Sequence, residues 1–307
     1  MAILRSPLVW IAAAMALLAA LLPLWLSAYL LAVLTAAYYF GVFAMAWDLL
    51  FGFAGEVNFG PTFLIGVGAY TAAILNSKFG LPIPLCVVAA ALAAVVGGIL
   101  LAVPALRLRG PYFGLVTLVA VLLLQNFVVI FAGVTGGEIG MTVPDVLSID
   151  VNVNYWYALS FLVVCAVLLF GLSRSAVGLI LQASGQDAVE AAALGFNVTK
   201  HKVAAFCVSA LFSGTAGAML VFYMGTASVD TVVDIAIGVQ IIIAAVLGGR
   251  RTILGAVLGA VFLIVANEFL RPLGQLNTLV VAAIALAVIL FFPEGLLGYA
   301  LHRDESQ

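Results

Sequence analysis

The sequence predicts an all-α fold, a polytopic transmembrane helical bundle of about ten spans with both termini in the cytoplasm. Three observations predict it. Of the 307 residues, 66% are hydrophobic and only 8% are charged, whereas a typical soluble domain carries roughly 25% charge. Long runs without a charged residue follow one another along the chain, and Lys and Arg gather in alternate loops. We therefore expect residues 1–307 to form a single transmembrane domain.

The uncharged runs place the individual helices. About 20 apolar residues cross the roughly 30 Å hydrocarbon core, and Pro and Gly break the longer runs. The first run follows Arg5 as in a signal peptide, but no cleavage site ends it, so we expect an uncleaved first span. The expected helices cover residues 8–26, 29–47, 61–76, 83–103, 112–132, 155–172, 203–223, 235–248, 253–269 and 277–292.

The positive charges orient the bundle, because cytoplasmic loops of membrane proteins are rich in Lys and Arg. With the N-terminus inside and ten alternating helices, all Lys and Arg residues except Lys78 and Arg271 fall in cytoplasmic segments. The segment 133–154 has acids but no Lys or Arg, and it falls outside. The residues predicted to be cytoplasmic are Arg5, Arg107, Arg109, Arg174, Lys200, Lys202, Arg250, Arg251 and Arg303.

Two of the expected helices have a face of small residues. One contains Gly255-x-x-x-Gly259 with alanines beside it, and another contains Ala210, Gly214 and Ala218. Small side chains let two helix backbones approach closely inside a membrane. We expect these faces to serve packing within the chain rather than pairing of two copies.

The most polar stretch is the predicted cytoplasmic loop 174–202. Within it Ser184 is a candidate N-cap with Asp187 three residues on, and Gly195 suits the position after a helix end. Residues 185–194 would form about 15 Å of helix, half the thickness of the hydrocarbon core. Such a helix cannot span the membrane. On the cytoplasmic surface it is placed to contact a partner.

Groups that would support catalysis are missing at membrane depth. His201 and His302 both lie in predicted cytoplasmic flanks, and the chain has no H-E-x-x-H, no convincing G-x-S-x-G and no ATP-binding P-loop. No Cys and His spacing suits a metal site, and no basic patch suits nucleic acid. The sequence therefore predicts no catalytic residues, no metal site and no nucleic-acid partner. It predicts that membrane lipid surrounds the chain.

A few polar residues are candidates for lining a transport path. They are Glu56, Asn58, Gln125 and Asn126. Polar groups inside a membrane usually face the bundle interior or a wet cavity. Hydrogen bonding between helices is an equally good interpretation for each of them.

The segment containing Glu56 and Asn58 is interrupted by Gly52, Gly55 and the pair Gly60-Pro61. A re-entrant piece is tolerated at depth only where protein or a water-filled cavity surrounds it. A short cytoplasmic turn leading into the third span is an equally good interpretation.

Six segments, taken together and in order, resemble LivM-type permease subunits of bacterial ATP-binding-cassette (ABC) importers for branched-chain amino acids and related small solutes. The likeness runs from about residue 30 to residue 298. The segments are DLLFGFAGEVNFGPTFLIGVGAYTAAIL from residue 48, LRLRGPYFGLVTL at 106–118, TGGEIGMT at 135–142, GQDAVEAAALGFNVTKHKVAAF at 185–206, VLGGRRTILGAVLGA from residue 246 and FFPEGLLG from residue 291.

The chain departs from the family pattern in places. Glu56 stands where the family commonly has glutamine, and Gly60-Pro61 where it has a Gly-His pair. Arg250-Arg251 make a link that is usually less charged. Glu190-Ala191-Ala192 with Gly195 resembles the EAA…G signature of ABC importers, with the glycine one residue closer than usual.

The resemblance implies a bacterial or archaeal cytoplasmic membrane protein that works with a second, LivH-type permease, two cytoplasmic ABC ATPases and an extracytoplasmic solute-binding protein. ATP and Mg would be bound by the ATPases, with no cofactor on this chain. The path would run between the two permeases. The short helix near 184–195 would be the coupling helix, with Ser184, Asp187, Glu190 and Gly195 at the ATPase contact.

Two other classes of function are weighed against this one. A stand-alone secondary carrier or channel would move a small polar solute without ATP, but buried carboxylates, which such carriers normally need, are scarce here. A membrane-embedded enzyme is disfavoured by the missing catalytic groups. Within the ABC interpretation, branched-chain or related neutral amino acids are the expected solutes, and urea or short amides are the alternatives.

Overall fold

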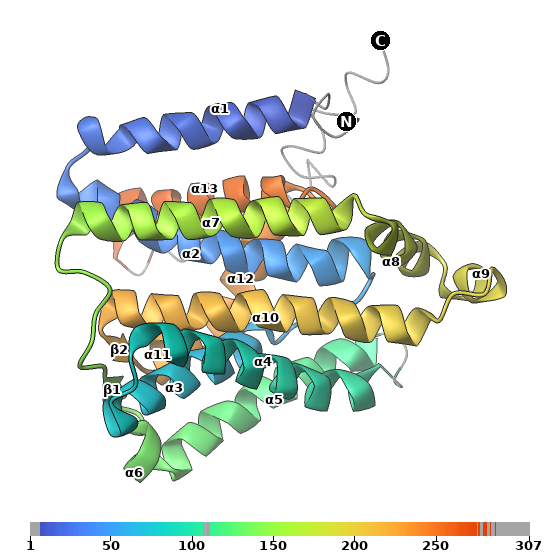
Figure 1. Ribbon diagram of the computed structural model, residues 1–307, viewed down its shortest axis with the longest axis horizontal. Helices are drawn as coiled ribbons and strands as arrows, with labels where there is room; N and C mark the ends of the chain where they lie inside the picture. Colours follow the sequence, from blue (N-terminus) through green and yellow to red (C-terminus); the bar gives the residue numbers. More distant parts are fainter. Residues whose placement is uncertain are drawn as a thin grey trace.

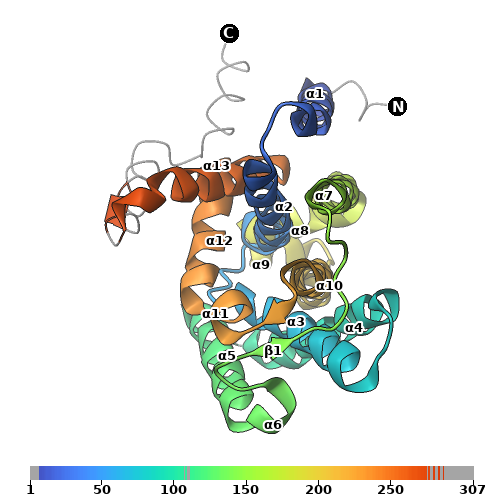
Figure 2. The ribbon, with the colours of Figure 1, turned by 90° about the vertical axis from the view of Figure 1, so that its left-hand side faces the viewer.

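In the computed structural model, α1, α2, α7 and α10 lie along one common direction, and helices such as α5, α12 and α13 are inclined to them (Figure 1 and Figure 2). The structure describes residues 7–106, 108, 111–274, 276, 279, 280, 283 and 286. Within these residues the all-α prediction is confirmed. Most of the predicted span 277–292 lies outside the described residues, as do the FFPEGLLG segment, both termini and residues Arg5, Arg107, Arg109, His302 and Arg303. The cytoplasmic position of the termini therefore stays a prediction.

The elements follow the predicted order. They are α1 (Pro7–Leu21), a 3-10 turn (Leu22–Leu24), α2 (Ala28–Asp48), a π-helical turn (Leu49–Phe53), α3 (Pro61–Phe79), α4 (Ile83–Ala105), α5 (Pro111–Ile130), α6 (Ala132–Thr135), β1 (Met141–Thr142), α7 (Val151–Ser173), α8 (Ala176–Gln186), α9 (Ala188–Ala193), α10 (Val198–Met224), β2 (Thr226–Ala227), α11 (Val229–Val232), α12 (Ile235–Gly248), α13 (Leu254–Leu270) and a 3-10 turn (Arg271–Leu273).

Each predicted span from 8–26 to 253–269 coincides with a helix, and 235–248 matches α12 at both ends. Six helical segments in the described part of the chain are long and apolar enough to cross a membrane, and α13 and residues 14–24 form shorter apolar helices. The structure therefore supports a polytopic membrane protein, with a span count established only in part.

Helices α2 and α10 form the centre of the bundle. About two thirds of the apolar stretch of each is buried, against a third of α5 and α7. Figure 2, which looks along the helices, shows α2 and α10 near the middle, with α3, α4, α7 and α12 around them. Side chains on α4, α5 and α7 are exposed over much of their length, which suits contact with lipid or another subunit.

Small residues hold the central helices together. A Cβ atom at Gly68 of α3 would collide with the backbone of Gly214 in α10, and one at Gly214 would collide with Ala94 of α4. In the same way, Gly248 and Gly255 bring the backbones of α12 and α13 into contact. The prediction that the small-residue faces pack within the chain is confirmed.

The two ends of the bundle carry different structures. At one end β1 and β2 pair antiparallel, with Met141 opposite Ala227, and the Asn76 side chain of α3 donates to Asp145 at 2.7 Å. Helices α8 and α9 lie at the other end (Figure 1). The loop predicted to be external and the loop predicted to be cytoplasmic thus lie at opposite ends of the molecule.

We predict that Gly68→Ala lowers the free energy of unfolding by about 1–3 kcal/mol, because the added methyl group forces α3 away from α10. The matched control is Gly171→Ala in α7, where a Cβ atom has open space around it. This control should be neutral or stabilising by up to about 1 kcal/mol, because Ala favours helix. Thermal unfolding of the purified proteins in detergent measures both, and equal midpoints would refute the packing argument.

Candidate functional site

The predicted surface helix exists as α9, and its end is as expected. The amide nitrogen of Gly195 donates to Ala192 O at 2.9 Å, and that of Phe196 donates to Ala191 O at 3.2 Å. Gly195 itself has a φ of +90°, a left-handed conformation that glycine adopts without a steric penalty. Gly195 is therefore confirmed as the residue that ends the helix.

The predicted start of this helix is wrong. Asp187, not Ser184, is the N-cap: its Oδ1 accepts hydrogen bonds from Val189 N at 2.7 Å and Glu190 N at 3.0 Å. Ser184 is buried inside α8, where its hydroxyl donates to Ile180 O at 2.7 Å. The reason is that Ser175 caps an earlier helix, which continues past Ser184 to Gln186. The short helix is therefore α9, of six residues.

Helix α9 projects from the bundle, and large apolar side chains on it and directly after it are exposed. Val189 and Leu194 are 79% and 75% exposed, and the acidic side chain of Glu190 lies between them in sequence and is also exposed. Of the helix residues, Ala191 alone is buried. The helix packs against little else, so these apolar and acidic side chains are accessible at the end of the molecule.

Helix α8 connects α9 to the interior of the bundle. Gly185, near the end of α8, lies so close to Gly55 that a Cβ atom on it would fall 2.9 Å from Gly55 N and 3.0 Å from Ala54 C. Gly55 has a φ of +72°, which favours glycine. The two backbones therefore touch without intervening side chains. The loop 54–60, which joins the π-helical turn to α3, cannot move independently of α8.

A second contact attaches the same loop to α10. Glu56 Oε1 lies 2.6 Å from Lys202 Nζ, and the two side chains are 19% and 15% exposed. An ion pair this little exposed is screened weakly by water and salt. Glu56, predicted as a candidate pore residue, is thus paired within the chain.

Asn58 forms its hydrogen bonds within the chain. Its side chain is buried, with Oδ1 accepting a hydrogen bond from Gly60 N at 2.8 Å, and its carbonyl oxygen accepts from Trp47 Nε1 at 2.6 Å. The next residue, Phe59, donates its amide to Thr117 Oγ1 of α5 at 3.0 Å. The loop is buried at Ala54, Asn58 and Gly60 and partly buried at residues 55–57, whereas the Phe59 side chain is exposed.

The two polar residues of α5 have different surroundings. Gln125 is half-buried, and its Nε2 donates to Val233 O between α11 and α12 at 3.3 Å. Asn126 is exposed on the outer face of α5, where its Nδ2 donates to Leu122 O at 2.8 Å. Among the four candidate path residues, Asn126 alone faces out of the chain. A role in lining a path stays a prediction for all four.

The structure contains a polar cluster that the sequence did not predict. Asp48 is buried at the end of α2, and its Oδ1 accepts a hydrogen bond from Arg251 N at 3.1 Å. The Arg251 Nε donates to Gly52 O at 2.9 Å, and the Arg250 guanidinium lies 4.6 Å from the centroid of the Phe51 ring. The signal was present, because a carboxylate at the end of an apolar helix needs a partner. Its partner lies some 200 residues away.

No metal-binding cluster appears in the part of the chain that the structure describes: no three His, Cys, Asp or Glu side chains come together there.

Comparisons with known proteins agree with one another. The chain matches the family described as the permease component of branched-chain amino acid transport systems over residues 29–293. It is 28% identical over 290 residues to the high-affinity branched-chain amino acid transport system permease protein LivM of Salmonella typhimurium and of Escherichia coli, covering 83% of this chain and 67% of each relative. It is 28% identical to the corresponding protein BraD of Pseudomonas aeruginosa, covering 86% of this chain and 93% of that relative. No solved structure matches the chain.

We predict that Asp187→Ala frays α9, because two amide groups lose their acceptor. The amides of Val189 and Glu190 should exchange with solvent about fivefold faster, as expected for the roughly 1 kcal/mol loss of an N-cap. Hydrogen exchange followed by mass spectrometry measures this. Ser184→Ala is the control and should leave exchange in α9 unchanged; the opposite pattern would restore Ser184 as the cap.

Proposed function

The chain belongs to the family of permease components of branched-chain amino acid transport systems, and from that membership we propose that it is the permease subunit of an ATP-driven importer of branched-chain amino acids. It would form the path together with a LivH-type second permease in the bacterial inner membrane. Two cytoplasmic ATPases, which bind ATP and Mg, and an extracytoplasmic solute-binding protein would complete the assembly. The observation that carries the proposal is α9, an exposed, capped helix attached to the interior of the bundle.

The proposed ATPase contact is the outer surface of α9. Val189 and Leu194 are the apolar side chains available for a groove on the partner, and Glu190 adds a negative charge. Interfaces of this kind obtain most of their binding energy from a few side chains that become buried. Asp187 and Gly195 contribute by fixing the two ends of the helix. Ser184 would act indirectly, through α8.

The proposed transmission from the ATPase to the path runs through the loop 54–60. A displacement of α9 moves α8, and α8 touches the loop at Gly55. The loop leads directly into α3 and is bonded to α5 through Thr117. Such packed elements switch between discrete arrangements rather than deforming continuously. ATP-driven movement of α9 would thereby shift α3 and α5 relative to the rest of the bundle.

The Glu56–Lys202 ion pair would make α10 move together with the loop 54–60. The pair connects the loop to Lys202, the fifth residue of α10. The loop therefore contacts the chain on both sides of α9, at Gly185 of α8 and at Lys202 of α10. A secondary carrier would instead need a carboxylate free to bind its coupling ion. Uptake by the purified single chain in liposomes under an ion gradient, without ATP, would favour that alternative.

We predict that Leu194→Asp, by placing a charge in the ATPase contact, weakens copurification of the ATPases about tenfold or more. Solute-stimulated ATP hydrolysis should fall with it. The control is Ile149→Asp, a 95% exposed residue before α7 at the opposite end of the molecule, which should leave ATPase binding intact. If Leu194→Asp assembled normally with the ATPases, α9 would not be the ATPase contact.

The solute class is identified by a separate measurement, the uptake of leucine, valine and urea by the wild-type complex.

We also predict that reversal of either charge, as Glu56→Lys or Lys202→Glu, lowers transport per ATP hydrolysed while the ATPases stay bound. Each single change leaves two like charges close together in a poorly hydrated site. The double reversal restores an opposite pair and should recover most of the transport, with a coupling energy of about 1–3 kcal/mol in thermal unfolding. Equal defects in the single and double variants would show that the pair has no role in transmission.

A further inference from the structure

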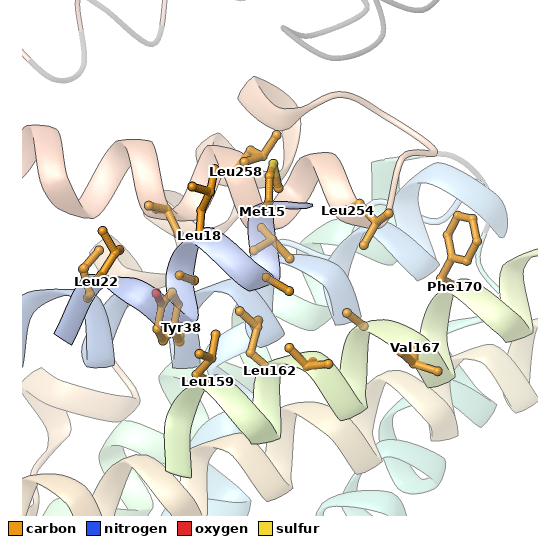
Figure 3. Close-up of a pocket in the computed structure, with 17 residues that line it drawn as sticks. Met15, Leu18, Leu22, Tyr38, Leu159, Leu162, Val167, Phe170, Leu254 and Leu258 are labelled. Atoms are coloured by element: carbon orange, nitrogen blue, oxygen red, sulfur yellow. The ribbon is translucent and has the colours of Figure 1, made fainter. Parts of the chain in front are cut away.

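An apolar cavity of about 510 Å³ lies between α1 and the rest of the bundle. Figure 3 shows side chains of α1, α2, α7 and α13 pointing into it, among them Leu18, Leu162 and Leu258. Tyr38 supplies the one polar side-chain atom among the lining residues, and its hydroxyl is hydrogen-bonded to that of Tyr155 at 2.7 Å. Only an apolar occupant suits these walls.

A second cavity, of about 220 Å³, adjoins the first at the end of the molecule that carries α8. The two share Phe170 and Leu254, which stand together at one end of the apolar cavity in Figure 3. The lining of the second cavity, which we call the polar cavity, combines polar side chains with apolar ones such as Phe53 and Leu179. It includes Arg174, Gln182 and Arg251.

Both arginines bring positive charge that the described residues do not neutralise by an ion pair. The Arg174 guanidinium lies 5.3 Å from the centroid of the Phe170 ring, at the junction of the two cavities. Within the described part of the chain, the Arg251 guanidinium donates through Nε alone, to the backbone oxygen of Gly52. The nearby Asp48 carboxylate is not part of the lining: its Oδ1 accepts from the Arg251 backbone amide, and its Oδ2 is buried without a partner among the described residues. The polar cavity therefore suits an anion.

The length of the apolar cavity matches one leaflet of a membrane. Its lining on α7 runs from Leu159 to Phe170, about 16 Å of helix at 1.5 Å per residue. Half of a hydrocarbon core of roughly 30 Å is about 15 Å. The arginine-lined cavity lies at the end of this stretch, at the side where the positive-inside rule places the cytoplasm.

We propose that the joined cavities bind one anionic phospholipid of the cytoplasmic leaflet. Its phosphate lies at Arg174 and Arg251, and an acyl chain lies under α1. A free anion would leave the apolar walls uncovered, and a zwitterionic lipid would bring a cation toward the two arginines. The bound acyl chain fills the space between α1 and the bundle. The headgroup contacts Arg251, whose Nε donates a hydrogen bond to Gly52 O just before the loop 54–60.

The test uses the full chain purified in detergent, with lipid retention counted by native mass spectrometry. Phosphatidylglycerol, phosphatidylcholine and glycerol 3-phosphate are the probes. The Arg174→Gln variant removes a charge from the polar cavity, and Val163→Trp fills the apolar one. Lys200→Gln, an exposed cation outside both cavities, and Val164→Trp, the neighbouring residue outside the lining, are the matched controls.

The wild type should retain one phosphatidylglycerol in preference to phosphatidylcholine. Retention should fall about fivefold in Arg174→Gln, the loss expected for one basic side chain near an anionic headgroup. It should fall at least as much in Val163→Trp and stay unchanged in both controls. Arg174→Lys, which keeps the charge, should restore retention and so separates lipid binding from misfolding.

Three results would overturn the proposal. Equal retention of phosphatidylcholine would mean that the headgroup charge is not recognised. Equal thermal stabilisation by glycerol 3-phosphate would show a site for soluble anions. Absence of any retained lipid, with Val163→Trp unchanged in stability, would show that another part of the chain or nothing at all occupies the cavity.

Discussion

Helices within a bilayer cannot associate by escaping from water, because lipid tails are as apolar as the helix surfaces, so close contact between backbones must hold this bundle together. The contact of α3 with α10 depends on Gly68 and Gly214, and that of α12 with α13 on Gly248 and Gly255. The same device joins α8 to the loop 54–60. A contact of this kind has no flexible side chain to absorb a movement, so it both stabilises the helices and transmits displacement between them.

The polar residues of the bundle obey a second constraint, the cost of an unpaired charge or amide in a poorly hydrated interior. Glu56 is paired with Lys202, and Asn58 accepts a hydrogen bond from the backbone of Gly60. Asp48 accepts one from the backbone of Arg251 through Oδ1, whereas its buried Oδ2 has no partner among the described residues. Two of these residues were expected to line a path. That role stays a prediction, and in the structure the two residues fasten the irregular segment that joins α2 to α3. Glutamine at position 56, the residue common in the family, would carry no charge for Lys202 to neutralise.

The sequence was sufficient for the helices and insufficient for the contacts between them. Charge-free runs located α12 to the residue, because Gly and Asp mark its ends. They could not decide between Ser184 and Asp187 as caps, since both residues suit that position and the choice depends on how far α8 continues. The partners of Glu56 and Asp48 lie about 150 and 200 residues away, and no local pattern reveals them. The positive-inside rule did place α8 and α9 opposite the segment 133–154.

The length of α10 has a consequence of its own. Its 27 residues form a rod of about 40 Å, held near one end by Glu56 and followed at the other by β2, which is paired to β1. A tilt imposed at either end must therefore appear at the other. Energetic coupling between two sites is reciprocal. In the proposed assembly, a solute-binding protein that favours one position of the β1–β2 pair would thus change how tightly α9, at the opposite end, binds its proposed ATPase, even with no solute bound.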